Sequence, residues 1–290
     1  LRETLGKMNH ESWESDSQAV LLKLKELIPF ELPAIRFGLE TSILDLFNGG
    51  KKRILKNDFF DAQKPIPING LIWMGDKDFM LEQIDQKLSE GFDCIKMKIG
   101  AIDFEQEIAL LSYIRSRFSP EQITLRVDAN GAFAGDEAME RLNRLAEFDI
   151  QSIEQPIPAG NWDAMRKLCE KTPLAIALDE ELIGVEEKEQ LLDQIRPQHI
   201  ILKPTLIGGI METQEWIRLA EGRNIGWWMT SALESNIGLN AISQLASTYD
   251  SEIHQGLGTG KLYHNNLESP LEVRSGFIHY NSAIPWENPM

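Results

Sequence analysis

The chain has 290 residues, of which 42% are hydrophobic and 26% charged, a composition typical of a folded globular protein and not of a disordered one. Its net charge of −16 argues against non-specific binding to nucleic acid or to an anionic membrane. The sequence contains no uncharged apolar run of about 18 residues and no signal-peptide core, so we expect neither a membrane span nor secretion. Cys94 and Cys169 form no CxxC motif, which excludes a disulfide framework or zinc ribbon and favours a reduced, cytoplasmic protein.

Residues 1–65 differ in pattern from the rest of the chain. Apolar spacing predicts one helix over residues 20–28 and a second over residues 37–47. Asn48-Gly49-Gly50 supplies the stop signal for the second helix, because glycine adopts the left-handed conformation at little cost. Two helices with polar joints make a small appendage and not a complete domain.

From Pro65 onward, short β-rich runs alternate with helical stretches. The predicted strands span residues 68–74, 94–98, 123–128, 152–154, 174–179, 200–203, 226–230 and, with the weakest pattern, 252–255. The predicted helices span residues 78–90, 104–117, 136–148, 162–171, 185–194, 211–222 and 237–247. This alternation predicts parallel strands with right-handed crossovers, and eight units favour a closed TIM-like (β/α)₈ barrel over residues 66–264. In the tail, residues 265–290, the segment 271–280 is predicted to pair as a strand with the N-terminal appendage.

Charged residues stand at the carboxyl ends of five successive predicted strands. They follow one another at intervals of 24 to 30 residues, which corresponds to one strand–helix unit each, and they are Lys98, Asp128, Glu154, Asp179 and Lys203. Active sites of (β/α)₈ barrels form at this end of the strands. The pattern therefore predicts one site built from all five residues.

Three of these residues, Asp128, Glu154 and Asp179, are carboxylates on neighbouring strands. Three carboxylates that converge do not stay ionised together without a cation. Oxygen ligands suit a hard cation, and Mg²⁺ keeps open positions for water or substrate. The pattern therefore predicts a metal site for Mg²⁺, with Mn²⁺ as the alternative.

Lys98 and Lys203 come from strands that lie four apart in a ring of eight, so they should face each other across the barrel mouth. A substrate carboxylate on the metal would then place its α-carbon between two amines. Removing the weakly acidic α-proton requires a base and stabilisation of the resulting enediolate, which a lysine and a metal supply. The residues favour this chemistry on a small-molecule carboxylate substrate.

Each charged residue also has a purely structural interpretation. A single Asp at a strand end is often a helix N-cap, a single Lys there is usually solvent-facing, and Asp179-Glu180-Glu181 resembles a solvated acidic run. These interpretations do not explain five charges in phase with the barrel period, in the order Lys, Asp, Glu, Asp, Lys.

The charged motifs resemble those of the enolase superfamily. Its muconate-lactonizing-enzyme subgroup has motifs similar to Lys96-Met97-Lys98, Asp128-Ala129-Asn130, Glu154-Gln155-Pro156, Asp179-Glu180 and Lys203-Pro204. A Lys or His base working with Mg²⁺ is the established chemistry of this superfamily. Within the subgroup the chain looks most similar to the o-succinylbenzoate synthase family, through residues 67–73, 178–182, 230–236 and 256–259.

The resemblance implies a role for each of these residues. Lys98 would remove the α-proton and then, as its conjugate acid, assist the loss of hydroxide, while Lys203 would hold the enediolate by its charge. Lys96 would lower the pKa of Lys98 and contact the substrate carboxylate. Asn130 and Glu180 would hold the site residues in position without contacting the substrate. The implied activity is Mg²⁺-dependent syn-dehydration of 2-succinyl-6-hydroxy-2,4-cyclohexadiene-1-carboxylate to 2-succinylbenzoate in menaquinone biosynthesis.

The last two strand-end loops should meet the succinyl tail of such a substrate. Ser231 and the backbone N–H groups near Gly256 and Gly258 are the candidate contacts, although this region also has a structural interpretation in which Ser235 and Asn236 cap the next helix. The resemblance further implies a small α+β capping domain built from residues 1–65 and 265–290. Because the opening strands of the family's cap have no counterpart here, we expect the N-terminal part of this domain to be incomplete.

Two other functions remain open on the sequence alone. N-succinylamino-acid racemases and dipeptide epimerases resemble the same subgroup and also use a lysine on each side of the substrate. A non-catalytic binding barrel would tolerate loss of the strand-end charges, yet all five are present. The oligomeric state is not specified by the sequence.

Overall fold

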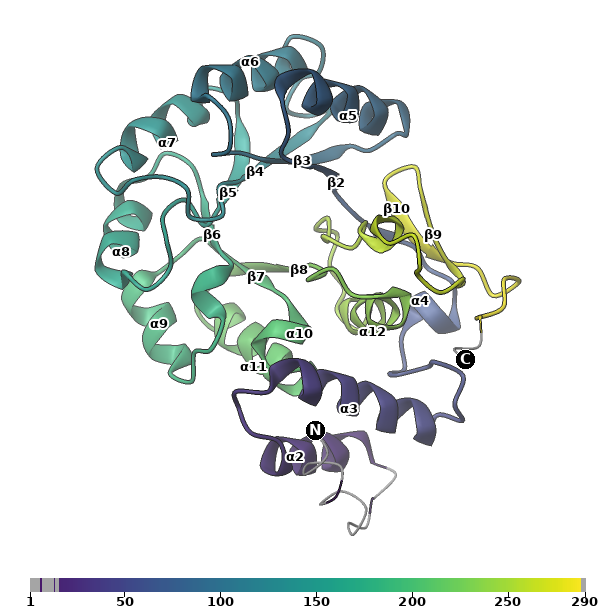
Figure 1. The fold of residues 1–290 in the computed structure, drawn as a ribbon. Helices are drawn as coiled ribbons and strands as arrows, with labels where there is room; N and C mark the ends of the chain where they lie inside the picture. Colours follow the sequence, from purple (N-terminus) through teal and green to yellow (C-terminus); the bar gives the residue numbers. More distant parts are fainter. Residues whose placement is uncertain (1–5, 7–12, 14–15, 288–290) are drawn as a thin grey trace.

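The computed structural model describes residues 6, 13 and 16–287 (Figure 1). Part of the predicted N-terminal appendage, residues 1–5, 7–12 and 14–15, lies outside the described residues, as do residues 288–290. Within the described ranges, no helix combines the length and apolar character needed to span a bilayer.

A curled sheet of seven parallel strands forms the centre of the molecule, and its strands are hydrogen-bonded in sequence order (Figure 1). The strands are β2 (Gly70–Ile72), β3 (Cys94–Lys98), β4 (Thr124–Asp128), β5 (Ile150–Glu154), β6 (Ile176–Leu178), β7 (His199–Leu202) and β8 (Gly226–Met229). The α-helices that follow these strands are α5 (Lys77–Ser89), α6 (Phe104–Arg115), α7 (Ala138–Ala146), α8 (Trp162–Lys171), α9 (Lys188–Ile195), α10 (Pro204–Ile207), α11 (Ile210–Glu221) and, after the last strand, α12 (Asn236–Ala246). The predicted TIM-like α/β fold is confirmed.

Side chains alternate along each strand, which divides the core into an outer and an inner part. On β4, Leu125 and Val127 belong to the large cluster between sheet and helices. A separate small cluster inside the curl consists of Ala177, Ile201 and Trp228. The buried Arg126 guanidinium lies 4.1 Å from the centre of the Trp228 ring, so side chains fill the interior beneath the strand ends.

The predicted eighth strand, residues 252–255, was wrong, because the structure has only single-residue bridges at Gln255 and Gly256. The Gln255 N–H donates to the Pro67 carbonyl (2.8 Å), and the Gly256 N–H donates to the Met229 carbonyl (2.8 Å). Gln255 thus bonds to the edge of the sheet beside β2, and Gly256 bonds to the opposite edge beside β8. A Cβ at Gly256 would lie 2.3 Å from Thr230 Oγ1, so this approach requires glycine.

The C-terminal segment forms a hairpin and not the single strand predicted over residues 271–280. Its strands are β9 (Leu271–Arg274) and β10 (Phe277–Tyr280), and β10 pairs antiparallel with β1 (Ile66–Pro67). The two loop residues, Ser275 and Gly276, both have positive φ (48° and 76°), the conformation of a type I′ turn that reverses the chain.

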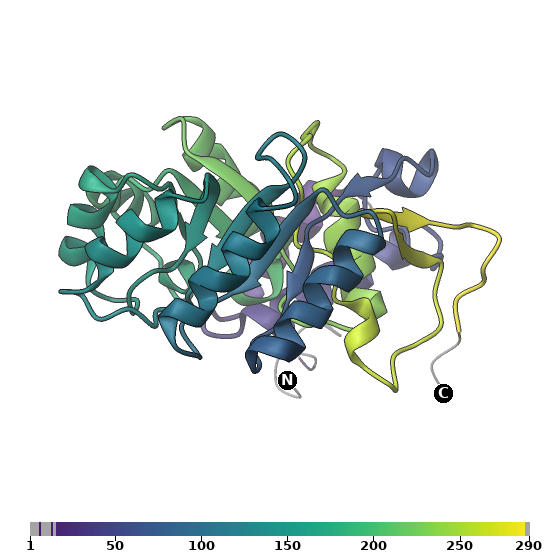
Figure 2. The same ribbon diagram turned by 90° about the horizontal axis from the view of Figure 1, so that it is seen from above.

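The hairpin also contacts the N-terminal segment through α4 (Asp58–Asp61). The ring of Tyr280 lies 5.9 Å from that of Phe59 and 4.7 Å from that of Phe60. Figure 2 shows this blue helix beside the yellow hairpin at one end of the barrel. These contacts join α4 to the hairpin, and we propose that the described parts of residues 1–65 and 265–290 belong to one unit beside a barrel unit of residues 66–264.

Two N-terminal helices, α2 (Ser17–Leu27) and α3 (Pro33–Phe47), pack against α10 and α11 of the barrel (Figure 1). The buried Arg36 guanidinium lies 3.3 Å from Glu212. The Glu40 carboxylate accepts the backbone N–H of Ile210 and so caps α11 from another helix. Burial raises the pKa of Glu40 to about 8, although the backbone N–H groups of Ile210 and Met211 and the charge of Arg36 act to lower it.

Glu40→Gln is therefore expected to change how stability depends on pH. A carboxyl whose pKa is raised in the folded state binds its proton more tightly there, so wild-type stability should fall as pH rises from about 4.5 to about 8. The Glu40→Gln variant keeps an acceptor oxygen but cannot ionise, and it should lose this dependence. Melting temperatures should differ by a few degrees at pH 8 and converge near pH 4.5. Parallel pH profiles of the two proteins would contradict the assignment.

Candidate active site

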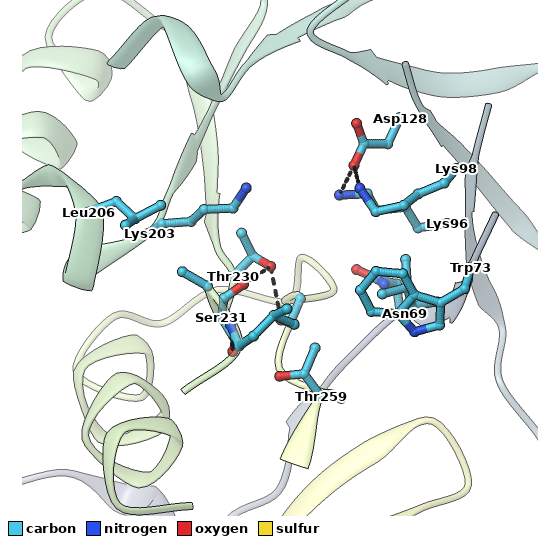
Figure 3. Close-up of a pocket in the computed structure, with 15 residues that line it drawn as sticks. Asn69, Trp73, Lys96, Lys98, Asp128, Lys203, Leu206, Thr230, Ser231 and Thr259 are labelled. Carbon is cyan, nitrogen blue, oxygen red and sulfur yellow. Dashed lines mark hydrogen bonds and ion pairs between the residues drawn. The ribbon is translucent and has the colours of Figure 1, made fainter. Parts of the chain in front are cut away.

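A pocket of about 300 Å³ opens at the carboxyl ends of the strands (Figure 3). The lining residues come from β2, β3, β4 and the residues that flank β2, from the segments after β7 and β8, and from the loop after α12. They are Asn69, Leu71, Trp73, Lys96, Lys98, Asp128, Lys203, Leu206, Thr230, Ser231, Ala232, Leu233, Gly256, Gly258 and Thr259. Both predicted strand-end lysines lie in this lining. The pocket is thus where the sequence pattern placed the site.

The register of the sheet sets the first three charges in one row. Lys98 pairs with Asp128 across β3 and β4, and Asp128 pairs with Glu154 across β4 and β5. Lys96 precedes Lys98 by two residues and therefore points to the same side of β3. Its Nζ lies 2.9 Å from Asp128 Oδ2 and also pairs with Glu154. Lys98 Nζ lies 2.9 Å from the same Asp128 oxygen.

The other two charges follow directly on β6 and β7. Asp179 forms an ion pair with Lys203, whose Nζ lies 3.9 Å from Glu154 Oε1. Figure 3 shows Lys203 extending into the pocket from the side opposite Lys98 and Lys96. The structure therefore brings all five residues together, with the three carboxylates buried and the lysines on two sides of the pocket.

Hydrogen bonds from the strand-end turns hold these groups in place. Asn130, with a φ of 43°, directs its N–H to Asp128 Oδ1 (3.0 Å) and its side-chain amide to Glu180 Oε1 (2.9 Å). Lys98 Nζ donates to Asn130 Oδ1 (2.5 Å). The fully buried Gln155 accepts the Asp179 N–H (3.2 Å). Asn130 and Glu180 thus form a chain of hydrogen bonds to Lys98 and Asp128, and Gln155 holds Asp179 in the same way.

Burial and the lysine charges act in opposite directions on the carboxylates. Burial, followed by the negative charges of Asp128 and Asp179, raises the pKa of Glu154 well above its usual range. Burial also favours protonation of Asp128, but Lys96 and Lys98 outweigh it and hold the pKa of Asp128 below its usual range. Burial opposes the charge of Lys96, yet Glu154 and Asp128 raise the pKa of Lys96 above its usual value. The site thus holds a charged Lys96 next to Glu154, a carboxylate that is costly to ionise.

The carboxylates of Asp128, Glu154 and Asp179 suit a divalent cation, provided that the lysine ammonium groups move away from their oxygens. As they stand, no three His, Cys, Asp or Glu side chains among the described residues are arranged to hold a metal ion, because ammonium groups occupy the carboxylate oxygens. However, Glu154 Oε1 is buried without a hydrogen-bond partner. Buried polar atoms are rarely left unpaired, and a hard cation bound by oxygen ligands satisfies such an atom. A cation on Asp128 would also compete with Lys98 for Oδ2.

The expected substrate contacts after β8 have mixed outcomes. Ser231, Gly256 and Gly258 all line the pocket. The Ser231 hydroxyl donates to Glu234 (2.5 Å), and the Gly256 N–H is used in closing the sheet. The Ser231 hydroxyl and the Gly256 N–H are therefore not free to donate to a ligand, and the two residues only shape the pocket wall. The expected helix cap by Ser235 is not made by its side chain.

Several pocket residues were not singled out by sequence patterns. The Trp73 ring lies 5.9 Å from Lys98 Nζ, close enough for a cation–π contact. Asn69 and Thr259 also face the pocket, and all three residues lie within sequence stretches that carried the family resemblance without being assigned a role. No periodicity marks these three, since they lie at a strand start, a strand end and a closing loop. Only knowledge that these loops meet above the barrel could have identified them.

The family model for the enolase C-terminal domain-like fold matches residues 80–284. An o-succinylbenzoate synthase of Desulfotalea psychrophila is 56% identical over 248 residues, which cover 85% of this chain and 67% of that relative. A second o-succinylbenzoate synthase, from Bacillus subtilis, is 27% identical over 83% of this chain, and the match spans 64% of its own length.

Solved structures agree with these matches. The crystal structure of MenC from Desulfotalea psychrophila superposes with a TM-score of 0.85 at 49% identity, covering 96% of this chain and 80% of that one. Muconate lactonizing enzyme from Pseudomonas putida shares the fold, with a TM-score of 0.79 at 22% identity over 94% of this chain and 77% of its own. Together with the matched family model, these findings show that the chain belongs to the enolase superfamily.

Proposed function

We propose that this protein is an o-succinylbenzoate synthase, which dehydrates 2-succinyl-6-hydroxy-2,4-cyclohexadiene-1-carboxylate to 2-succinylbenzoate in menaquinone biosynthesis. The observation that supports the reaction type is the pair of lysines, Lys98 and Lys203, on opposite sides of one pocket with three carboxylates between their strands. The observation that supports the substrate is 56% identity to a relative with this name.

Lys98 serves as the base in this proposal, and it acts in its neutral amine form. It takes the proton on the carbon next to the substrate carboxylate, and the electron pair left behind becomes part of the ring as hydroxide departs. The same lysine, now carrying the proton, returns it to the leaving hydroxide, so that one water is lost and the ring becomes aromatic. Lys203 holds its positive charge opposite Lys98, where it stabilises the negative charge that develops on the carboxylate.

Asp128, Glu154 and Asp179 hold Mg²⁺ in this proposal, with Mn²⁺ as the alternative. When bound, the metal supplies positive charge to the substrate carboxylate, as is general in this superfamily. Lys96 contributes charge from the floor of the pocket, where it pairs with both Asp128 and Glu154. Asn130 orients Lys98 by accepting its hydrogen bond, and Glu180 in turn fixes Asn130.

The substrate is a small-molecule carboxylate, and a cytoplasmic location without nucleic-acid or membrane partners fits the proposal. The net charge of −16 supports the absence of these partners, since both carry negative charge.

The direct test follows ultraviolet absorbance with the cyclohexadiene substrate, once with Mg²⁺ and once with excess chelator. We expect the diene band to disappear only with Mg²⁺. No change in either condition would reject the proposed reaction.

Epimerisation or racemisation is the second candidate, because a lysine stands on each side of the pocket. An L-amino acid-D/L-Glu epimerase of Sulfurimonas denitrificans is 26% identical over 71% of this chain. Proton exchange in deuterated water, measured by NMR on N-succinylamino acids and dipeptides, separates the two candidates. Exchange at the α-carbon of these compounds, with no dehydration of the diene, would favour the epimerase.

A further inference from the structure

Two pocket side chains have buried oxygens without any hydrogen-bond partner among the described residues. They are Asn69 Oδ1 and Thr259 Oγ1, and the two residues are only 4% and 7% exposed. A buried hydroxyl or amide oxygen without a partner costs on the order of 1–3 kcal/mol, and buried polar atoms are seldom left in this state. Such atoms in a pocket wall indicate a ligand that completes them.

The usual structural explanation for a threonine at this position does not apply. Thr259 is the N-cap residue of the short 3₁₀ helix η2 (Gly260–Leu262), where a hydroxyl commonly accepts a backbone N–H, yet its side chain makes no capping bond. The backbone of Asn69 is fixed, because its N–H donates to the Gln255 carbonyl (3.0 Å). Both side chains are therefore held in the wall by the segment that closes the barrel, while their oxygens remain uncommitted.

Both residues line the same pocket. A Cβ placed on Gly258, the residue before Thr259, would lie 3.6 Å from the backbone carbonyl oxygen of Asn69, so the closing loop runs beside the backbone of Asn69. Figure 3 shows Asn69 beside Trp73 and Thr259 at the pocket edge, both removed from Lys203. Asn69 and Thr259 also line a neighbouring cavity of about 750 Å³, which Lys96, Lys98 and Lys203 do not line, so the two residues stand where the two cavities meet.

The chemistry of the pair defines what it binds. A threonine hydroxyl donates one hydrogen bond. The Oδ1 atom of asparagine only accepts, so Asn69 donates to a ligand oxygen through Nδ2, which a half-turn of the amide brings to the position of Oδ1. Neither group carries charge, and the neighbouring Leu71 and Gly258 offer an apolar surface suited to methylene groups. The pair therefore fits an oxygen acceptor at the end of a short aliphatic arm.

We propose that Asn69 and Thr259 bind an oxygen of the substrate's succinyl arm and so select substrates that carry this arm. The proposal rests on the function proposed above and adds specificity-determining residues to it. The arm offers two oxygen acceptors, its keto group and its terminal carboxylate, and the test below distinguishes them.

The test measures binding of three ligands by calorimetry with Mg²⁺ present. The ligands are 2-succinylbenzoate, 2-butanoylbenzoate, which keeps the keto group but lacks the terminal carboxylate, and benzoate, which lacks the arm. Thr259→Val and Asn69→Leu should each weaken 2-succinylbenzoate binding between about twofold and tenfold, the range of one hydrogen bond. Benzoate binding should not change, and Thr259→Ser should restore the wild-type affinity.

Loss with 2-butanoylbenzoate as well assigns the keto group, and loss with 2-succinylbenzoate alone assigns the carboxylate. Thr248→Val, on the far end of α12 with its hydroxyl bonded to Leu245, is the matched control and should change nothing. Unchanged affinity in both variants, equal loss for all three ligands, or no binding of 2-succinylbenzoate by the wild type would overturn the proposal. If Asn69→Leu does not fold, the affinities of Thr259→Val and Thr259→Ser for 2-succinylbenzoate test the proposal on their own. Wild-type turnover of the diene is measured separately, so failure of this inference is distinct from failure of the proposed function.

Discussion

Lys98→Ala is expected to reduce dehydration of the cyclohexadiene substrate between about 10²- and 10⁴-fold, the usual contribution of a positioned base. The ammonium group of Lys98 reaches the pocket with 16% of the side chain exposed, so truncation removes a reactive group and opens no core cavity. Asp128 keeps its contact with Lys96 at 2.9 Å, and we therefore expect the fold to survive. The measurement is the initial rate of loss of the diene band under saturating Mg²⁺, with melting temperature as the check on folding.

A surface lysine provides the control for this experiment. Lys64→Ala removes a largely exposed side chain that only approaches Asp250, at 3.8 Å, and it should leave the rate unchanged. A Lys98→Ala protein that folds normally and retains near wild-type turnover would show that another group is the base. Lys203→Ala then separates the two sides of the pocket, because a synthase needs proton transfer from Lys98 alone, whereas an epimerase needs it from both lysines.

Much of this site was predictable because its charged residues repeat with the strand–helix units of the barrel. A charged residue at the end of each strand repeats with every strand–helix unit, and parallel strands bring their carboxyl ends to one edge. The observed register confirms this geometry, with Lys98 beside Asp128 and Asp128 beside Glu154. Each of these positions therefore follows from local sequence and one topological rule.

Features that depend on contacts between distant segments were not predictable in this way. Residues 252–255 have some strand propensity, but both neighbouring edges accept only Gln255 and Gly256, so no regular strand forms. The turn at Ser275-Gly276 divides the expected C-terminal strand into a hairpin. Likewise, the commitment of the Ser231 hydroxyl to Glu234 becomes visible only when the loop after β8 is folded.

The lysine–carboxylate pairs also differ from the expected arrangement of an open metal site. Converging carboxylates were expected to need a cation, and the structure satisfies that need with ammonium groups on Asp128 and Asp179. Glu154 also pairs with Lys96 through Oε2, but its Oε1 is buried without a hydrogen-bond partner. This makes Glu154 the most informative position for testing the metal.

Glu154→Gln is expected to weaken Mg²⁺ binding at least about tenfold, because even groups that only support metal ligands contribute that much. The amide keeps the size of the side chain and removes its negative charge. Without metal the variant should be about as stable as the wild type at neutral pH, since burial raises the pKa of Glu154 and makes its ionised form costly there. The measurements are calorimetric titration with Mg²⁺ and melting temperature with and without the metal.

The decisive comparison is the metal-dependent increase in melting temperature. A ligand that binds only the folded state stabilises it in proportion to the logarithm of its concentration over Kd, so weaker binding at Glu154→Gln must shrink this increase. Glu170→Gln removes an exposed carboxylate that pairs with Arg166 on the outer surface, and it should leave both the Mg²⁺ affinity and the increase unchanged. Equal affinity in wild type and Glu154→Gln would remove Glu154 from the ligand set. Glu154 lies on the strand between those that carry Asp128 and Asp179. Without Glu154 the ligand set would lose its middle member, and Asp128 and Asp179 would not be expected to share one metal ion.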